Sequence, residues 1–311
     1  MKRLLFVFVF LVAALPALAL EKVEIALNWK PEPEFGGFYA AQVAGIYKKH
    51  GLKAEILPGG SGTPVIQMLA AGKIDFGIVS ADELVISRAN GSDVIAIFAT
   101  FQTNPQGIMT HADRGFRSIG DVFKGEGTLA IQRGLPYAEY LLKKYGQPKV
   151  KIVPYLGGIA NFLNDKNYSQ QVFITAEPIE AKKREVNIKT FLVADEGYNP
   201  YTVVLATRSS FMKKNPKLVE SVVKAVREGW QEYLKNPGPS NKVMGELNKA
   251  MDASTFAMSA EAQRPLIETA ETKKSGLGTM TEARWRRLVD QLADLKLIKG
   301  KPEAKDLFVN L

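Results

Sequence analysis

Short apolar segments that alternate with helical segments are the feature that most constrains this chain. Between residues 23 and 101 the pattern predicts strands at 23–27, 52–57, 74–79 and 94–101, and helices at 38–50, 63–71 and 82–90. The last of these strands is apolar throughout, as expected for a strand buried on both faces of a parallel sheet. Alternation at this short spacing predicts a parallel α/β unit.

A second α/β unit follows, and after it comes a helical tail without strands. The unit contains predicted strands at 128–131, 151–154, 172–175 and 190–193 and helices at 118–123, 137–145 and 178–185. A further strand is predicted at 202–207, and tail helices at 214–235, 240–250, 260–270 and 281–296. Such a tail must pack on a sheet that already exists. We therefore expect a two-lobed α/β protein with a two-strand hinge, in which residues 20–103 and 207–311 form lobe one and residues 104–206 form lobe two.

The first nineteen residues have the layout of a secretory signal peptide. Met1–Arg3 is basic, Leu4–Leu15 is apolar, and Ala17–Ala19 offers small residues for cleavage. The apolar run is shorter than the roughly 20 residues that span a bilayer. We predict cleavage after Ala19 and export of the remainder.

The exported chain contains no cysteine, so it has neither a disulfide nor a lipid-carrying cysteine at its first position, where Leu20 stands. We therefore expect a protein without a membrane anchor, in the periplasm, acting as a monomer. Removal of Lys2 and Arg3 lowers the formal charge from +9 to +7, and the remaining basic residues are spread along the chain. This distribution does not indicate a nucleic-acid partner.

Several motifs follow the predicted elements in order. They are Asn28–Pro31, Gly37–Ala41, Gly45–Leu52, Ala70–Gly77, Thr175–Pro178 and Gly197–Tyr201. With them the chain resembles the NMT1/THI5-like solute-binding proteins. The resemblance implies the type II periplasmic-binding-protein fold and, as partners, a small-molecule ligand and the permease and ATPase of an ABC importer. It also implies a ligand such as a pyrimidine precursor of thiamine, or riboflavin, with sulfonates, taurine and nitrate as alternatives.

One position departs from the family pattern. Thiamine-precursor proteins of this group carry a histidine six residues after the Trp29 position, and Phe35 stands there in this chain. The apolar ring favours stacking over hydrogen bonding. The resemblance extends to a pyrimidine synthase that has this histidine and a cysteine-rich iron motif. Because both are missing from the sequence, we expect a protein that is not an enzyme, has no catalytic or metal-binding residues and needs no cofactor.

Ligands of open α/β sheets bind at the carboxyl ends of the strands, and we selected residues there as candidates. Aromatic rings suited to stacking on a heterocycle are Trp29, Phe35, Tyr39, Phe101 and Tyr201. Candidate hydrogen-bonding groups are Asn28, Gly60, Ser61, Thr63, Ser80, Gln102 and Glu177. Glu177 is the expected acceptor for the N–H groups of an aminopyrimidine or flavin edge. Arg133 could pair with an anionic ligand or lie on the surface, and the sequence leaves this open.

Overall fold

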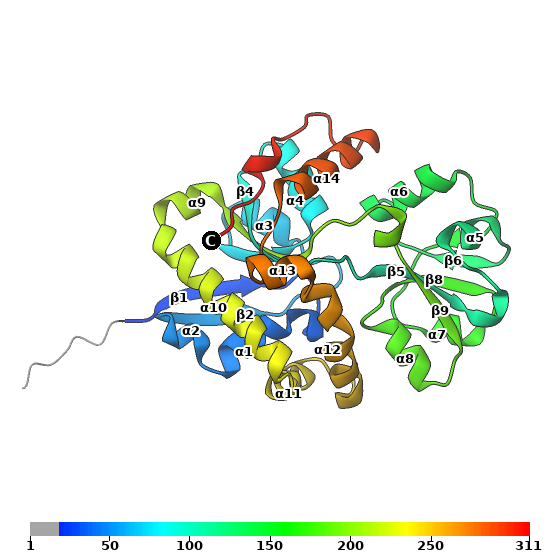
Figure 1. Cartoon of the computed structure of the whole chain (residues 1–311), viewed down its shortest axis with the longest axis horizontal. Helices are drawn as coiled ribbons and strands as arrows, with labels where there is room; N and C mark the ends of the chain where they lie inside the picture. The colour runs from blue at the N-terminus through cyan, green and yellow to red at the C-terminus, as the bar shows by residue number, and fades with distance from the viewer. Residues whose placement is uncertain (1–18) are drawn as a thin grey trace, which may run out of the picture.

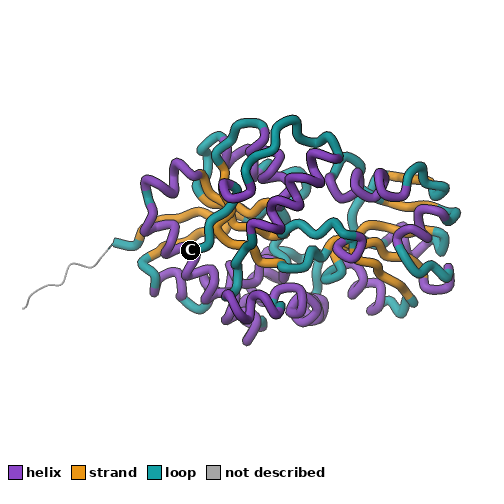
Figure 2. The backbone as a smooth tube through the Cα atoms, turned by 45° about the horizontal axis from the view of Figure 1, so that its top comes forward, coloured by secondary structure: helices purple, strands orange, loops and turns teal. Residues whose placement is uncertain are grey.

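The computed structural model describes residues 19–311, which form two lobes joined in the middle of the molecule, each built on a five-stranded sheet (Figure 1). Apart from Ala19, the predicted signal peptide lies outside the described residues. Turned by 45°, the two groups of strands remain separate, with helices around each (Figure 2). Each lobe therefore has its own sheet.

The sheet of lobe one has the order β2-β1-β3-β10-β4. Its strands are β1 (Glu21–Ala26), β2 (Leu52–Leu57), β3 (Phe76–Val79), β4 (Val94–Phe101) and β10 (Thr202–Arg208). β1 pairs in parallel with β2 and β3, whereas β10 lies antiparallel between β3 and β4. All residues of β3 and β4 are buried, in keeping with the continuous apolar sequence of β4.

The helical tail packs on lobe one, together with the helices that connect its first strands (Figure 1). These elements are η1 (Pro33–Phe35), α1 (Gly36–Val43), α2 (Ile46–Lys49), α3 (Val65–Ala70), α4 (Ala81–Ala89), α9 (Ser209–Lys214), α10 (Pro216–Lys235), α11 (Gly238–Leu247), α12 (Ala253–Ile267), α13 (Ala270–Ser275), α14 (Glu282–Asp294) and η4 (Ala304–Asp306). The long helix α10 crosses α1 closely because α1 begins with two glycines. A Cβ at Gly37 would lie only 2.3 Å from the indole ring of Trp230.

The sheet of lobe two has the order β7-β6-β8-β5-β9. Its strands are β5 (Gln106–His111), β6 (Thr128–Ala130), β7 (Lys151–Val153), β8 (Tyr168–Phe173) and β9 (Ile188–Leu192), and its helices are η2 (Ala112–Arg114), α5 (Ile119–Lys124), α6 (Pro136–Tyr145), α7 (Ala160–Asn164), α8 (Glu177–Lys183) and η3 (Ala194–Glu196). β6 pairs in parallel with β7 and β8, and β5 pairs antiparallel with β8 and β9.

Two strands of lobe two differ from the sequence prediction. β5 was not predicted, and β8 begins at Tyr168 rather than at residue 172. β8 carries the polar run Ser169–Gln171, which a simple hydrophobic pattern excludes from a buried strand. Its side chains are satisfied locally: Ser169 bonds to Thr110 at 3.1 Å, and the amide of Gln171 bonds to the side chain of Gln132 at 2.8 Å.

The chain passes between the sheets twice, after Phe101 and before Thr202. The predicted boundary between residues 206 and 207 falls inside β10, whose residues pair with β3 and β4. Arg284 of α14 forms hydrogen bonds to both segments that cross between the lobes. Its guanidinium donates to the backbone carbonyls of Gln102 (2.5 Å), Asn199 (2.8 Å) and Pro200 (3.1 Å).

Candidate ligand-binding site between the lobes

Acidic and aromatic side chains from both lobes meet where α8 lies next to α12. The loop between β1 and α1 contributes Trp29 and Glu32 from lobe one, and Tyr155 and Glu177 come from lobe two. The charge of Glu177 acts on Glu32, and the charge of Glu32 acts on Tyr155. These four residues, together with Glu34, are called the interlobe cluster below.

Glu177 is fixed by groups of its own lobe. The hydroxyl of Tyr155 donates to one carboxylate oxygen at 2.7 Å, and the backbone N–H of Phe173 donates to the other at 3.0 Å. Burial raises the pKa of Glu177, although these hydrogen bonds oppose the rise. The next residue after Tyr155, Leu156, is 80% exposed and adds an apolar side chain to the same loop. Glu177 is therefore oriented by lobe two before any contact with lobe one.

The carboxyl group of Glu32 has weaker hydrogen bonds than that of Glu177. Burial, followed by the charge of Glu177, raises the pKa of Glu32 to about 7. Hydrogen bonds from Asn248 and Trp29 and the charge of Lys30 act in the opposite direction on this pKa. The bond from Asn248 measures 3.4 Å, near the limit for a hydrogen bond. The carboxyl group is consequently poised between its charged and neutral forms at neutral pH.

Glu34 is the most buried acid of the cluster, with 9% of its surface exposed. Burial, and then the charges of Glu32 and Glu177, raise its pKa well above the usual range. The charges of Glu32 in lobe one and of Glu177 in lobe two therefore both act on Glu34.

An ion pair joins the two lobes where α8 lies next to α12. Lys183 of α8 contacts Asp252, the residue before α12, at 2.6 Å, and donates to the hydroxyl of Thr255 at 2.9 Å. Asp252 also caps α12 by accepting from the backbone N–H of Thr255 at 2.9 Å. An exposed pair of this kind contributes about 0–1 kcal/mol, so it can hold the lobes together reversibly.

The glycine loop after β2 packs against the loop after β1. The backbone N–H of Gly59 donates to the carbonyl of Trp29 at 3.1 Å, which places the loop beside Asn28 and Trp29. Asn28 and Trp29 are half-buried, and Ser61 is exposed. The N–H of Gly60 donates to the hydroxyl of Thr63 at 2.9 Å, so this amide is used within the loop.

Two further predicted donors already have partners in their own elements. Ser80 is the N-cap of α4, where its hydroxyl accepts from the backbone N–H of Glu83 and donates to the side chains of Asp82 and Glu83. The amide of Gln102 donates to the carbonyls of Ala99 (3.2 Å) and Thr279 (3.1 Å). We therefore assign Ser80 and Gln102 structural roles in this conformation.

Most of the predicted stacking rings lie inside lobe one. Phe35, Tyr39 and Phe101 belong to the core that packs α1 and α10 on the sheet, and each is at most 2% exposed. The ring of Tyr201 is covered by the guanidinium of Arg284, which lies 3.9 Å from the ring centre. Its hydroxyl accepts from the backbone N–H of Thr281 at 2.9 Å. Tyr201 is accordingly a hinge residue, and only Trp29 keeps a partly accessible ring among these candidates.

The sequence analysis missed Glu32, Glu34 and Tyr155. The segment from Pro31 to Phe35 contains two glutamates, each after a proline, directly beyond the first strand. Their position at the carboxyl end of a parallel strand was the available signal. Arg133, in contrast, is exposed in lobe two.

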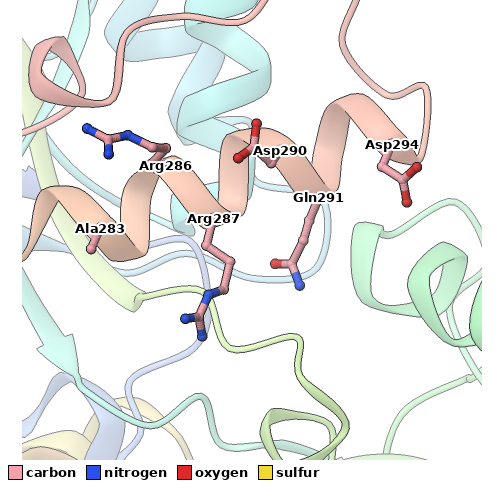
Figure 3. Close-up of a pocket in the computed structure, with 6 residues that line it drawn as sticks. All are labelled: Ala283, Arg286, Arg287, Asp290, Gln291 and Asp294. Atoms are coloured by element: carbon pink, nitrogen blue, oxygen red, sulfur yellow. The ribbon is translucent and has the colours of Figure 1, made fainter.

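Two surface hollows lie elsewhere, next to α14. One, of about 520 Å³, is lined by residues of α14 alone: Ala283, Arg286, Arg287, Asp290, Gln291 and Asp294 (Figure 3). The other, of about 320 Å³, lies between α6 and the end of α14, where Lys143 pairs with Asp294 at 2.5 Å. In Figure 1, α6 and α14 lie on the other side of the segments that join the lobes from α8 and α12. The lobes thus touch on both sides of the hinge.

The model of the family described as NMT1/THI5 like matches residues 32–240, which include both crossings and every residue of the interlobe cluster except Trp29. The chain belongs to the NMT1/THI5-like family. The resemblance seen in the motifs is thereby confirmed.

Individual relatives are distant but cover most of the chain. The formylaminopyrimidine-binding protein of Halalkalibacterium halodurans is 21% identical over 306 residues, which cover 94% of this chain and 91% of that protein. A 4-amino-5-hydroxymethyl-2-methylpyrimidine phosphate synthase of Saccharomyces cerevisiae is 22% identical over 232 residues, covering 70% of this chain and 68% of that enzyme. NMT1/THI5-like relatives therefore include both a binding protein and an enzyme.

The fold of this NMT1/THI5-like chain also matches solved structures. The periplasmic aliphatic sulphonate-binding protein SsuA from Escherichia coli has a TM-score of 0.71 at 14% identity, covering 94% of each chain. With the two mixed sheets, this confirms the predicted type II binding-protein fold. Across residues 19–311, none of the helices combines the length and apolar character needed to cross a membrane.

Proposed function

We propose that this chain is the exported solute-binding component of an ABC importer and that it captures a small nitrogen-containing heteroaromatic compound between its lobes. Family membership and the formylaminopyrimidine-binding relative support this proposal. The observation that carries it is the interlobe cluster, in which Tyr155 and Glu177 of lobe two meet Trp29 and Glu32 of lobe one.

The chemistry of the cluster suits a flat ring with N–H groups at its edge. The indole of Trp29 offers an apolar face for stacking. The carboxylate of Glu177, held by Tyr155, accepts N–H donors with the strength of a charge-assisted hydrogen bond. A thiamine-type pyrimidine fits these groups, and riboflavin is the second member of the proposed ligand class.

A sulfonate, taurine or nitrate is a poorer fit for this site. A sulfonate or nitrate, or the sulfonate end of taurine, would bring an anionic group to a region that already contains three carboxyl groups, those of Glu32, Glu34 and Glu177. Like charges in a partly buried site repel strongly because water screens them little.

Ligand capture would work through closure of lobe two against lobe one about the two crossings, which lie after Phe101 and before Thr202. The weak pair between Lys183 and Asp252 and the two crossing strands allow such a movement. Binding would then shift an equilibrium between open and closed forms. In this scheme a monomer in the periplasm presents the closed form to the permease, whose ATPase drives uptake.

The alternative that this chain is an enzyme finds little support in its reactive side chains. The sequence has no cysteine and only two histidines, and His111 is buried with its ring bonded to the carbonyl of Phe162 at 2.9 Å. Phe35, where the family pattern has a histidine, is a core residue. We therefore propose that the bound solute is released unchanged.

The test uses the mature protein with the hydroxymethylpyrimidine named above, riboflavin, taurine and nitrate, each measured by thermal shift and by calorimetry. We expect the pyrimidine or riboflavin to raise the melting temperature. Trp29→Ala should weaken this binding about tenfold to a hundredfold, since one stacked aromatic ring contributes about 1–3 kcal/mol.

Tyr155→Phe is the second variant, because it removes the hydroxyl that orients Glu177, and we expect weaker binding. Tyr140→Phe is its matched control in lobe two, since Tyr140 donates to the carbonyl of Glu196 at 2.8 Å, outside the interlobe cluster. Binding of taurine or nitrate alone, unaffected by Trp29→Ala, would refute the proposal. Recovery of a chemically altered pyrimidine after incubation would favour the enzyme.

A further inference from the structure

The segment of residues 29–35, called the Trp29 loop below, is extended and contains two buried prolines. Pro31 and Pro33 have no backbone N–H to donate. Glu32 between them has φ −137° and ψ 166°, so the two prolines lie on one face of the loop. Both prolines are buried, whereas Trp29 and Glu32 are half-buried. The backbone at the two prolines can therefore be held only through their carbonyl groups.

Each of these two carbonyls accepts a hydrogen bond from a buried amide side chain of the helical tail. The Nδ2 of Asn248, at the end of α11, donates to the carbonyl of Pro31 at 3.2 Å. The Nε2 of Gln263, in α12, donates to the carbonyl of Pro33 at 2.8 Å. Asn248 is 6% exposed and Gln263 is fully buried. In Figure 1, α11 and α12 lie beside α1, which directly follows the Trp29 loop. The donors stand 217 and 230 positions further along the chain than the prolines they hold.

The second polar atom of each amide shows why these residues are amides. The side-chain oxygen of Asn248 accepts from the backbone N–H of Ala250 at 3.2 Å, which directs its Nδ2 toward the loop. Among the described residues, the side-chain oxygen of Gln263 has no hydrogen-bonding partner. An unpaired oxygen in the core is costly compared with an apolar side chain. The contribution of Gln263 therefore lies in its bond to Pro33.

The helix that carries Gln263 also contacts lobe two and the hinge. The N-cap of α12, Asp252, forms the ion pair with Lys183 of lobe two. In the last turn of α12, the carbonyl of Leu266 accepts from the backbone N–H of Gln102, at the start of the first crossing, at 2.8 Å. Gln263 lies between these two contacts. The Trp29 loop is thus held by the same helix that meets lobe two and the crossing.

We propose that Gln263 and Asn248 are positioning residues of the ligand site, an inference that rests on the function proposed above. They fix the backbone of the Trp29 loop before a ligand arrives, so that the indole of Trp29 is already in place for stacking. A loop that had to be ordered on binding would lower the affinity, and a loop that is fixed beforehand avoids this loss. Gln263 makes the shorter bond and is expected to have the larger effect.

The first experiment measures hydrogen exchange in the unligated mature protein. The backbone N–H groups of Phe35 and Gly36 donate to the carbonyls of Glu32 and Pro33, so their exchange reports opening of the Trp29 loop. Gln263→Leu keeps a side chain of similar size and removes the donor. We expect the amides of Phe35 and Gly36 to exchange at least about tenfold faster in this variant.

The second experiment measures affinity by calorimetry with the hydroxymethylpyrimidine and with riboflavin. Gln263→Leu should weaken binding about tenfold, and Asn248→Leu about threefold. In a Trp29→Ala background the change at Gln263 should weaken binding less than about twofold, because the ring that it positions is absent. A loss of stability alone would leave the affinity of the folded protein unchanged, so this cycle separates positioning from a merely structural role.

Asn215→Leu is the matched control. The amide of Asn215 also donates to a backbone carbonyl, that of Phe211, at 3.2 Å. Asn215 stands between α9 and α10, at the end of lobe one that points away from lobe two (Figure 1). This variant should be less stable and should keep the wild-type values of loop exchange and affinity.

The outcomes separate this inference from the proposed function. Unchanged exchange at Phe35 and Gly36 in Gln263→Leu would overturn the positioning role, as would equal losses of affinity with and without Trp29. Where Gln263→Leu does not fold, Asn248→Leu is judged by the same two measurements. Failure of both probes to bind the wild-type protein overturns the proposed function, and the exchange rates then decide whether the tail fixes the loop.

Discussion

Arg284 gives the sharpest prediction about the hinge. Besides its three bonds to backbone carbonyls, its guanidinium donates to the side chain of Asn199 at 3.0 Å and covers the ring of Tyr201. Arg284→Ala removes all of these contacts together. It also leaves the carbonyls of Gln102, Asn199 and Pro200 without their donor at the two crossings.

The expected loss can be estimated from these contacts. A hydrogen bond to a charged group contributes about 1.5–3 kcal/mol, but bonds that share one side chain are not additive, and water can reach part of the site. We expect Arg284→Ala to lower the free energy of unfolding by about 3 kcal/mol, within the range of about 3–5 kcal/mol for breaking a buried charged network. For a chain of this size this corresponds to a fall in melting temperature of about 6–12 °C.

Urea unfolding followed by tryptophan fluorescence and by circular dichroism measures this loss. Arg286→Ala is the matched control on the same helix, because the guanidinium of Arg286 is exposed and pairs with Glu282, four residues away. We expect it to change the free energy of unfolding by less than about 0.5 kcal/mol. A loss below about 1 kcal/mol in Arg284→Ala, or equal losses in both variants, would refute the reasoning.

Three further predictions concern closure, pH and packing. Lys183→Met should weaken ligand binding two- to fivefold, because an exposed ion pair contributes about 0–1 kcal/mol. The same change at the neighbouring Lys182 should leave binding unaltered. Equal effects of the two changes in calorimetry would exclude an interlobe role for Lys183. Because the pKa of Glu32 rises from 4.5 to about 7 on folding, it contributes stability that is complete below pH 4.5 and is lost as pH rises through about 7. This amounts to at most about 3 kcal/mol in urea unfolding of the unligated protein, and Glu32→Gln should flatten that dependence. Gly37→Ala should cost about 1–3 kcal/mol by forcing a Cβ against Trp230, and a neutral effect in thermal unfolding would show that α1 and α10 can move apart.

Much of the fold could be predicted from the sequence because its signals are local. The ranges of β2 and β4 agree with the predicted strands at 52–57 and 94–101, where apolar residues end at glycine or polar residues. β8 could not be placed in this way, since Ser169–Gln171 are buried only because neighbouring strands and helices supply their hydrogen bonds. A hydrophobic pattern shows whether a side chain is polar, but it does not show whether the folded protein supplies that side chain with a hydrogen-bonding partner.

The candidate site shows even more clearly the difference between what the sequence predicts and what the tertiary structure decides. The sequence by itself determined that Trp29 stands at the carboxyl end of a first strand and the glycine loop at that of a second. It also determined that Glu177 stands beyond a strand of the second unit. Only the tertiary structure decided that Tyr201 is covered by Arg284, a residue more than eighty positions away along the chain. It also decided that the charges of Glu32 and Glu177 act on the buried Glu34, because burial and charge–charge interactions depend on distances in space that no local pattern encodes.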